Sequence, residues 1–239
     1  MSYEYYKSSF PATPTNQQQY WKDGLQDMIN RQFYDASDVY TIGEELTKGT
    51  LIFTDTDVRL NHIIEATTGE KLGDDFRNIV FKDLTHPKGM GFRYSFDDNV
   101  WICVNTDNYK FVTASAIIRR CNNTLNFTVA STPTEEPCVI DYKYTGTDIN
   151  FNTNINIAEG DIYVIAQYND ITKTIEINEK FMFGGQTFRV KAISNFLRTK
   201  TTDEDSIPLI NMVMRLDQIN TGNDDVENNI ADNEKYTWD

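Results

Sequence analysis

The chain has 239 residues, with 36 acidic and 22 basic side chains, a formal net charge of −14 and a pI near 4.5. This negative charge argues against a surface that clamps nucleic-acid phosphates, which requires a concentrated positive field. The absence of a run of about 18 apolar residues excludes a membrane-spanning helix. The N-terminal residues also lack the cationic start and apolar stretch of a signal peptide, so we expect a cytosol-like compartment.

Residues 1–15 predict an extended arm. The segment combines four aromatic residues with two prolines and shows no periodicity, and proline disfavours a regular helix. Exposed aromatic side chains require a partner surface, so the arm is a candidate for docking on a neighbouring subunit, while a frayed tail is the alternative. The aromatic residues of the arm are Tyr3, Tyr5, Tyr6 and Phe10.

The next segment predicts one amphipathic helix of four to five turns that begins near Asn16, a plausible N-cap. Gly24 weakens this helix by about 1 kcal/mol relative to alanine. Apolar side chains recur at helical spacing, which predicts packing on the β core or, as the alternative, on a partner. The apolar stripe consists of Trp21, Leu25, Met28, Ile29 and Phe33.

Beyond residue 38 the pattern is that of β-strands almost throughout. Short runs rich in β-branched and aromatic residues alternate with clusters of Gly, Asn, Asp and Pro. Residues 55–69 fit a short helix or a strand. The predicted strands are 49–54, 76–81, 91–96, 100–105, 111–121, 125–129, 138–144, 161–168, 174–178, 180–183, 187–193 and 209–216.

The sequence pattern predicts two β units. Residues 145–160, rich in Asn and Thr, are the best candidate for a link between them. This divides the chain into an arm and helix (1–35), a first β unit (36–145), a second β unit (146–219) and an acidic mobile tail (220–239). The tail ends with Tyr236 and Trp238, which are candidates for anchoring it to another subunit.

Two segments, 93–108 and 180–195, repeat one hairpin pattern. Each runs as a basic residue, two aromatics separated by one residue, a turn, and a third aromatic. Gly-Gly suits a tight primed turn in the second copy, whereas Asp-Asp-Asn in the first suggests a slightly longer one. Cross-strand aromatic pairs stabilise such ribbons, so these residues are predicted to be framework. They are Tyr94, Phe96, Trp101, Phe181, Phe183, Gly184, Gly185 and Phe188.

The repeat predicts a mainly β fold in which the N-terminal helix is followed by two small β-barrel or sandwich units. A single larger sandwich with related halves is the alternative, and a chance match between common aromatic hairpins is a third interpretation. A two-stranded ribbon is marginal by itself, so each hairpin needs further strands or a helix to cover its apolar face.

The sequence contains no recognisable catalytic, metal or cofactor site. Its two histidines, His62 and His86, lie outside any known motif, and no phosphate-binding or dinucleotide-binding pattern occurs. The three cysteines lack the spacing of a metal site and are interpreted as reduced, buried thiols. Arg119 and Arg120 are expected to pair with carboxylates rather than with nucleic acid. We therefore expect a protein that is not an enzyme and binds no cofactor.

Residues 66–142 resemble structural proteins of tailed phages that infect Gram-positive bacteria. The stretch "GFRYSFDDNVWICVNTDN" is similar to the hairpin of head–tail joining, or stopper, proteins, which are small β-barrels that form rings beneath the portal. The similarity covers about a third of the chain. This chain is about twice the length expected of a stopper, and adds a helix and a second β unit.

The resemblance implies a virion protein without enzymatic activity, a head–tail connector subunit that assembles in the host cytoplasm. Its partners would be copies of itself in a ring, the portal or adaptor, and tail proteins, with no membrane. The acidic charge would let DNA pass a channel without sticking or would simply keep the protein soluble. A tail completion, collar or baseplate component is the nearest alternative. A carbohydrate- or receptor-binding module, with Trp101 or Tyr109 stacked on its ligand, is the alternative of another class.

Overall fold

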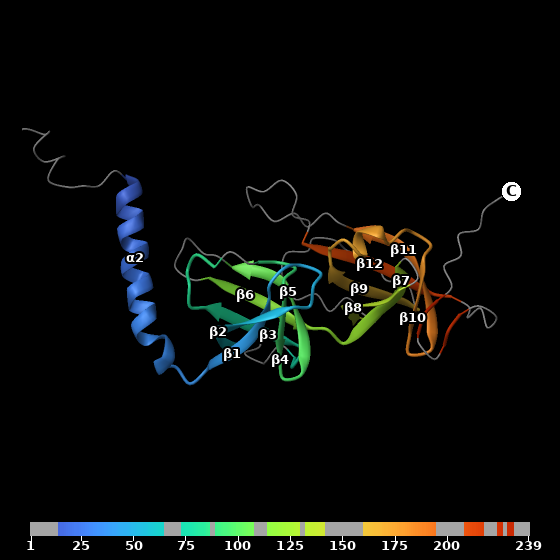
Figure 1. The fold of residues 1–239 in the computed structure, drawn as a ribbon, viewed down its shortest axis with the longest axis horizontal. Helices are drawn as coiled ribbons and strands as arrows, with labels where there is room; N and C mark the ends of the chain where they lie inside the picture. The colour runs from blue at the N-terminus through green and yellow to red at the C-terminus, as the bar shows by residue number, and fades with distance from the viewer. Residues whose placement is uncertain are drawn as a thin grey trace, which may run out of the picture.

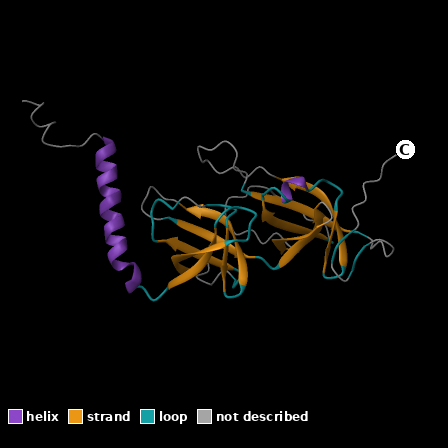
Figure 2. Ribbon diagram, viewed as in Figure 1, coloured by secondary structure: helices purple, strands orange, loops and turns teal. Residues whose placement is uncertain are grey.

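The computed structural model describes residues 14–64, 73–86, 89–107, 114–129, 132–141, 160–194, 208–217, 224–226 and 229–231, with only the backbone given at 14–18, 107, 127–129 and 132–133. The described chain forms one N-terminal helix and two six-stranded antiparallel sheets (Figures 1 and 2). The predicted fold class, a helix followed by two barrel-like β units, is confirmed.

The helix α2 spans Pro14–Gln32 and continues into the short 3-10 helix η1, Phe33–Asp35. It begins with proline, whose fixed φ suits the first helical position. Asn16 therefore lies inside the helix and is not its cap. A second 3-10 helix, η2, spans Thr172–Thr174.

The strands divide into two groups of six along the chain. The first group is β1 (Val39–Glu45), β2 (Phe53–His62), β3 (Phe76–Phe81), β4 (Arg93–Phe96), β5 (Asn99–Asp107) and β6 (Ser115–Arg120). The second group is β7 (Asn123–Val129), β8 (Thr132–Asp141), β9 (Asp161–Gln167), β10 (Lys180–Phe183), β11 (Gln186–Ser194) and β12 (Leu209–Leu216).

The first group closes into a barrel, here barrel 1, in the order β1-β2-β3-β6-β5-β4. A short ladder closes it, with Gly43 opposite Ser95 and Glu44 opposite Tyr94. Closure removes the exposed edges that an open sheet would present to other chains.

The second group, here sheet 2, has the order β10-β11-β12-β9-β8-β7. Read from β7, this is the order of barrel 1 with six added to every strand number. Its edge strands β7 and β10 lie close together, as β1 and β4 do in barrel 1. The two groups are therefore two copies of one topology.

The ladders repeat as well as the strand order. Tyr94 pairs with Trp101 in the β4–β5 hairpin, and Phe181 pairs with Phe188 in the β10–β11 hairpin. In each copy the strand after the turn carries a register shift that begins two residues beyond the paired aromatic, at Cys103 in β5 and at Val190 in β11. Equal position of a bulge in both copies argues against a chance match between two hairpins.

Both hairpin turns contain two residues. Asp97 and Asp98 have φ of 51° and 56°, and Gly184 and Gly185 have φ of 57° and 76°. Asn99 pairs with Phe96 inside the ladder, so the first turn is not longer than the second, contrary to the prediction from Asp-Asp-Asn.

The change from barrel 1 to sheet 2 falls at residues 121–122, earlier than the expected boundary at 145. The Cys121 amide still donates to Val100 of barrel 1, whereas the Asn122 amide donates to Cys138 of sheet 2. The Asn122 side chain then pairs with both backbone groups of Ile140, at 2.8 and 2.9 Å. Strands β7 and β8 consequently belong to sheet 2, although the sequence placed them in the first β unit.

Three further segments differ from the sequence-based prediction or resolve it. Residues 55–62 are part of β2, which settles the choice between helix and strand. Residues 174–178, predicted as a strand, comprise the last residue of η2 followed by coil and a turn. Strand β1 was not among the predicted strands.

Candidate assembly surfaces

The aromatic residues of the two hairpins pack in the cores of the two sheets, whereas Gly184 and Gly185 lie at a turn. Tyr94 and Trp101 belong to the core of barrel 1, where Phe96 stacks on Trp101 with ring centroids 4.6 Å apart. Only 3% of Trp101 is exposed, so this side chain is not available to stack on a carbohydrate. In sheet 2 the corresponding core residues are Phe181, Phe183 and Phe188.

The predicted subunit contacts of the arm and tail lie outside the described residues. These are Tyr3, Tyr5, Tyr6, Phe10, Tyr236 and Trp238. The surfaces that the structure does describe are the joint between the two sheets and the face of barrel 1 beside α2.

An apolar cluster joins barrel 1 to sheet 2. Ile102 and Val104 of β5 meet Val139 of β8 and Leu209 at the start of β12, all buried. Ile165 of β9 packs against the same cluster. Because these side chains point outward from their own sheets, the joint is a docking contact between two folded units.

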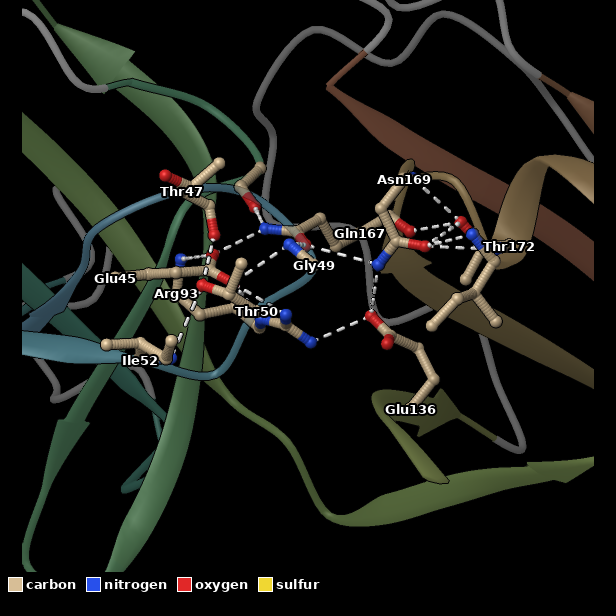
Figure 3. A network of polar contacts seen from close by, with 12 residues as sticks. Glu45, Thr47, Gly49, Thr50, Ile52, Arg93, Glu136, Gln167, Asn169 and Thr172 are labelled. Carbon is tan, nitrogen blue, oxygen red and sulfur yellow. Dashed lines mark hydrogen bonds and ion pairs between the residues drawn. The ribbon is translucent and has the colours of Figure 1, made fainter. Parts of the chain in front are cut away.

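A buried ion cluster lies beside this apolar contact (Figure 3). The Arg93 side chain of β4 has no exposed surface. It donates to Glu45 Oε1 of β1 at 2.6 and 3.0 Å, and across the joint to Glu136 Oε1 of β8 at 2.7 Å. One guanidinium thus faces two carboxylates from different sheets.

Two amide side chains of sheet 2 complete the cluster. Gln167 donates to Glu45 Oε2 at 2.6 Å and to the Gly91 carbonyl at 2.7 Å. Asn169 donates to Glu136 Oε1 at 2.8 Å. A buried charge network specifies an orientation when its polar groups are satisfied, so this cluster fixes how the two sheets meet.

The cluster shifts the protonation of Glu136. The pKa of the Glu136 carboxyl is raised to about 7, mainly by burial and to a smaller extent by the charge of Glu45, against the lowering effects of Arg93 and Asn169. Glu136 therefore lies within reach of protonation near neutral pH.

The backbone approaches very closely at the joint. Gly91 has φ of 86°, and a Cβ added there would lie 2.2 Å from the carbonyl oxygen of Pro208. Glycine is the residue that tolerates both conditions.

The other described surface is where α2 and η1 meet barrel 1. Gln26 of α2 donates to the Lys82 carbonyl at 2.8 Å and accepts from the Leu84 amide at 2.9 Å. Phe33 of η1 is buried. A cavity of about 240 Å³ remains between helix and barrel, lined by Leu25, Met28, Ile29, Gln32, Phe33, Arg59, Val80, Phe81 and Leu84.

The first half of α2 lacks this cover. Tyr20 and Trp21 are 78% and 76% exposed, and the helix projects away from barrel 1 in Figure 1. The predicted apolar stripe packs on the β core only through its C-terminal part.

The other residues considered in the sequence have structural partners. His86 stacks on Phe81 at 3.8 Å, and its Nε2 lies 2.7 Å from Glu44 Oε1. Arg119 pairs with Asp141, and Arg120 with Asp75.

The three cysteines, Cys103, Cys121 and Cys138, are free thiols. Burial raises the pKa of Cys103 to about 12. Among the described residues no group of three His, Cys, Asp or Glu side chains is placed to hold a metal, and no helix is long and apolar enough to cross a membrane.

The joint residues were not found by sequence reasoning. The joint residues come from four separate segments of the chain, and in sequence they resemble surface residues; they are Glu45, Arg93, Glu136, Gln167 and Asn169. The one available signal was the basic residue that opens each repeated hairpin, Arg93.

The fold and the joint between barrel 1 and sheet 2 define a tandem β protein, in which the two similar units are held in one fixed orientation. Residues 123–201 match the family model of the YomX C-terminal domain, a phage-associated family. The match begins at the first residue of β7, where sheet 2 begins. No curated protein and no solved structure matches the chain significantly.

Proposed function

We propose that this protein is a structural component of a phage virion, a head–tail connector subunit that forms a ring between the portal and the tail. The observation that carries the proposal is the match of residues 123–201 to a phage-associated domain. The matched residues include five of the six strands of sheet 2, β7 to β11, so the match concerns one continuous module rather than a scattered similarity.

The architecture supports a structural role. The hairpin aromatics are core residues of the two sheets. The buried charged residues Arg93, Glu45 and Glu136 join the two sheets rather than line an open cleft. A ring subunit needs such a rigid body, because every heterologous contact around a ring has to repeat the same geometry. The exposed Tyr20 and Trp21 of α2 are suited to contact a neighbouring copy.

The test is a phage that encodes this protein with its gene interrupted by an amber codon. Under non-suppressing conditions we expect DNA-filled heads and free tails by electron microscopy, and complementation should restore joined particles. Normal infectious virions without the protein would overturn the proposal, as would its absence from purified virions by mass spectrometry.

A label on the C-terminus of the protein in purified virions separates the connector from its nearest alternative. Gold at the neck of the particle supports a connector. Gold at the tail tip or baseplate supports a tail component, and the acidic charge would then have no relation to a DNA channel.

A further inference from the structure

The two copies of the barrel offer equivalent outer faces, and the ladders identify the equivalent residues. In sheet 2, Val139 of β8 pairs with Ile165 of β9. In barrel 1 the corresponding cross-strand pair is Arg59 of β2 with Val80 of β3. Both pairs stand next to a core pair, Cys138 with Ala166 and Val58 with Phe81 respectively.

These equivalent faces have different occupants. Val139 and Ile165 are covered by barrel 1 at the joint. Arg59 and Val80 line the cavity under α2 and η1. In Figure 1, α2 and sheet 2 accordingly stand on opposite sides of barrel 1.

The end of each third strand, β9 or β3, and the turn after it contact the docked element. At the end of β9 the Gln167 side chain donates to the Gly91 carbonyl of barrel 1, and in the turn that follows Asn169 lies against Gly49 of barrel 1. After β3, the backbone of Lys82 and Leu84 bonds to Gln26 of α2. On both copies, the outer side of the second and third strands and the turn after them form one docking face.

We infer that α2 is a cap. It covers the face of barrel 1 that is equivalent to the face of sheet 2 docked on barrel 1, and it thereby prevents a further β unit from docking there. Without a cap, a heterologous contact of this kind can repeat from copy to copy and generate open chains. Repeat proteins solve the same problem with terminal elements that cover the last face.

The surface of sheet 2 that is equivalent to the docking surface on β5 of barrel 1 carries charged side chains. The joint uses Ile102 of β5, which pairs with Arg119. The corresponding residue of sheet 2 is Arg189, which pairs with Arg215 and is bonded to Asp217 at 2.7 Å. A charged, partly exposed arginine in place of a buried isoleucine does not favour docking of a third unit.

The test uses the full chain with two carboxylates on the docked side of α2, Leu25→Asp with Ile29→Asp. Both side chains are half-buried against barrel 1. We expect the cap to detach, so that hydrogen exchange at the Leu84 amide, which donates to Gln26, becomes at least about tenfold faster. The matched control, Gln19→Asp with Gly24→Asp, adds the same charge at exposed positions of α2 that do not contact Gln26, and should leave that amide protected.

Uncapping should also increase self-association over that of the unaltered protein, measured by sedimentation velocity, because the apolar side chains of Val80 and Leu84 lose their cover while Arg59 stays paired with Asp38. Adding Val80→Lys to the uncapped variant should remove this gain while the Leu84 amide remains fast. Slow exchange of Val164 and Met212, which are fully buried in sheet 2, verifies that the variant is folded.

Three results would overturn the inference: an unchanged Leu84 amide, association no greater than that of the unaltered protein, or association that persists with Val80→Lys. If the uncapped variant loses protection in sheet 2, Gln26→Ala replaces it, since this change removes the two bonds to Lys82 and Leu84 and, apart from them, one exposed bond to Asn30. The same three results then decide.

Discussion

Asp98 and Gly185 occupy the second position of equivalent two-residue turns, with φ of 56° and 76°. The left-handed conformation costs a non-glycine residue on the order of 1 kcal/mol, whereas glycine adopts it freely. We therefore expect Asp98→Gly to raise the free energy of unfolding by about 1 kcal/mol, and Gly185→Asp to lower it by a similar amount, in urea titrations.

The two changes control for each other. A Cβ at Gly185 meets no atom within 4 Å, so backbone strain is the main difference there. If both variants change stability in the same direction, the equivalence of the two turns is wrong.

Gly91 has a role that depends on the joint. We expect Gly91→Ala to lower the free energy of unfolding by about 3 kcal/mol, because the new methyl group meets the Pro208 carbonyl and the left-handed backbone is strained.

Gly89→Ala is the matched control for Gly91→Ala. Its Cβ would lie 3.5 Å from Thr106, an ordinary contact, so a change within about 0.5 kcal/mol is expected by thermal unfolding. Equal effects of the two substitutions would show that Gly91 is not held against Pro208 in solution.

Among the elements, η1 anchors the N-terminal helix through Phe33, which is 4% exposed. Phe33→Ala should cost about 3 kcal/mol because it removes a buried ring and enlarges the adjacent cavity. The neighbouring Tyr34 is an exposed residue whose hydroxyl donates to Asp57, so Tyr34→Phe should cost less than about 1 kcal/mol.

Hydrogen exchange at the Leu84 amide distinguishes these variants. Phe33→Ala should speed it, because Gln26 then loses its position on barrel 1, whereas Tyr34→Phe should not. Equal rates of exchange at the Leu84 amide in the two variants would contradict the proposal that Phe33 anchors the helix.

Most strands were predictable because apolar and polar residues alternate along a strand that has one face buried in the core and the other exposed to solvent. Strand β1 was missed since two of its buried residues, Glu44 and Glu45, are charged. Residues 174–178 alternate like a strand, yet the turn before them is set by Asn169, whose side chain accepts from the amides of Ile171 and Thr172. Such local bonds compete with strand pairing.

For the whole molecule, the buried carboxyl at the joint predicts a pH dependence. The pKa of Glu136 is about 7 in the folded protein and near the ordinary 4.5 when unfolded. Between these values the folded state holds the proton more tightly, so the free energy of unfolding should fall as pH rises from about 4.5 to about 7. The contribution of this group is on the order of 3 kcal/mol.

Glu136→Gln provides the comparison, because a neutral amide keeps an oxygen for Arg93 and does not titrate. The difference in unfolding free energy between the unaltered protein and this variant should change steeply between pH 5 and pH 7, a range of about two units. Parallel stability curves for the two proteins would contradict the raised pKa.

The duplication was visible in the sequence only as one repeated hairpin. Elsewhere the equivalent core positions hold different residues, such as Val58 and Cys138 or Phe81 and Ala166. Different side chains of compatible packing fill equivalent places in a barrel, so topology persists where sequence identity does not.

The sequence by itself determined the class of fold, the strands with alternating faces and the repeated aromatic hairpin, because these depend on local periodicity. The tertiary structure alone decided which strands belong together, and it brought Arg93 to carboxylates 43 and 48 residues away. It also placed α2 on a docking face. Burial of charge and the pairing of distant strands depend on contacts that no local window of the chain contains.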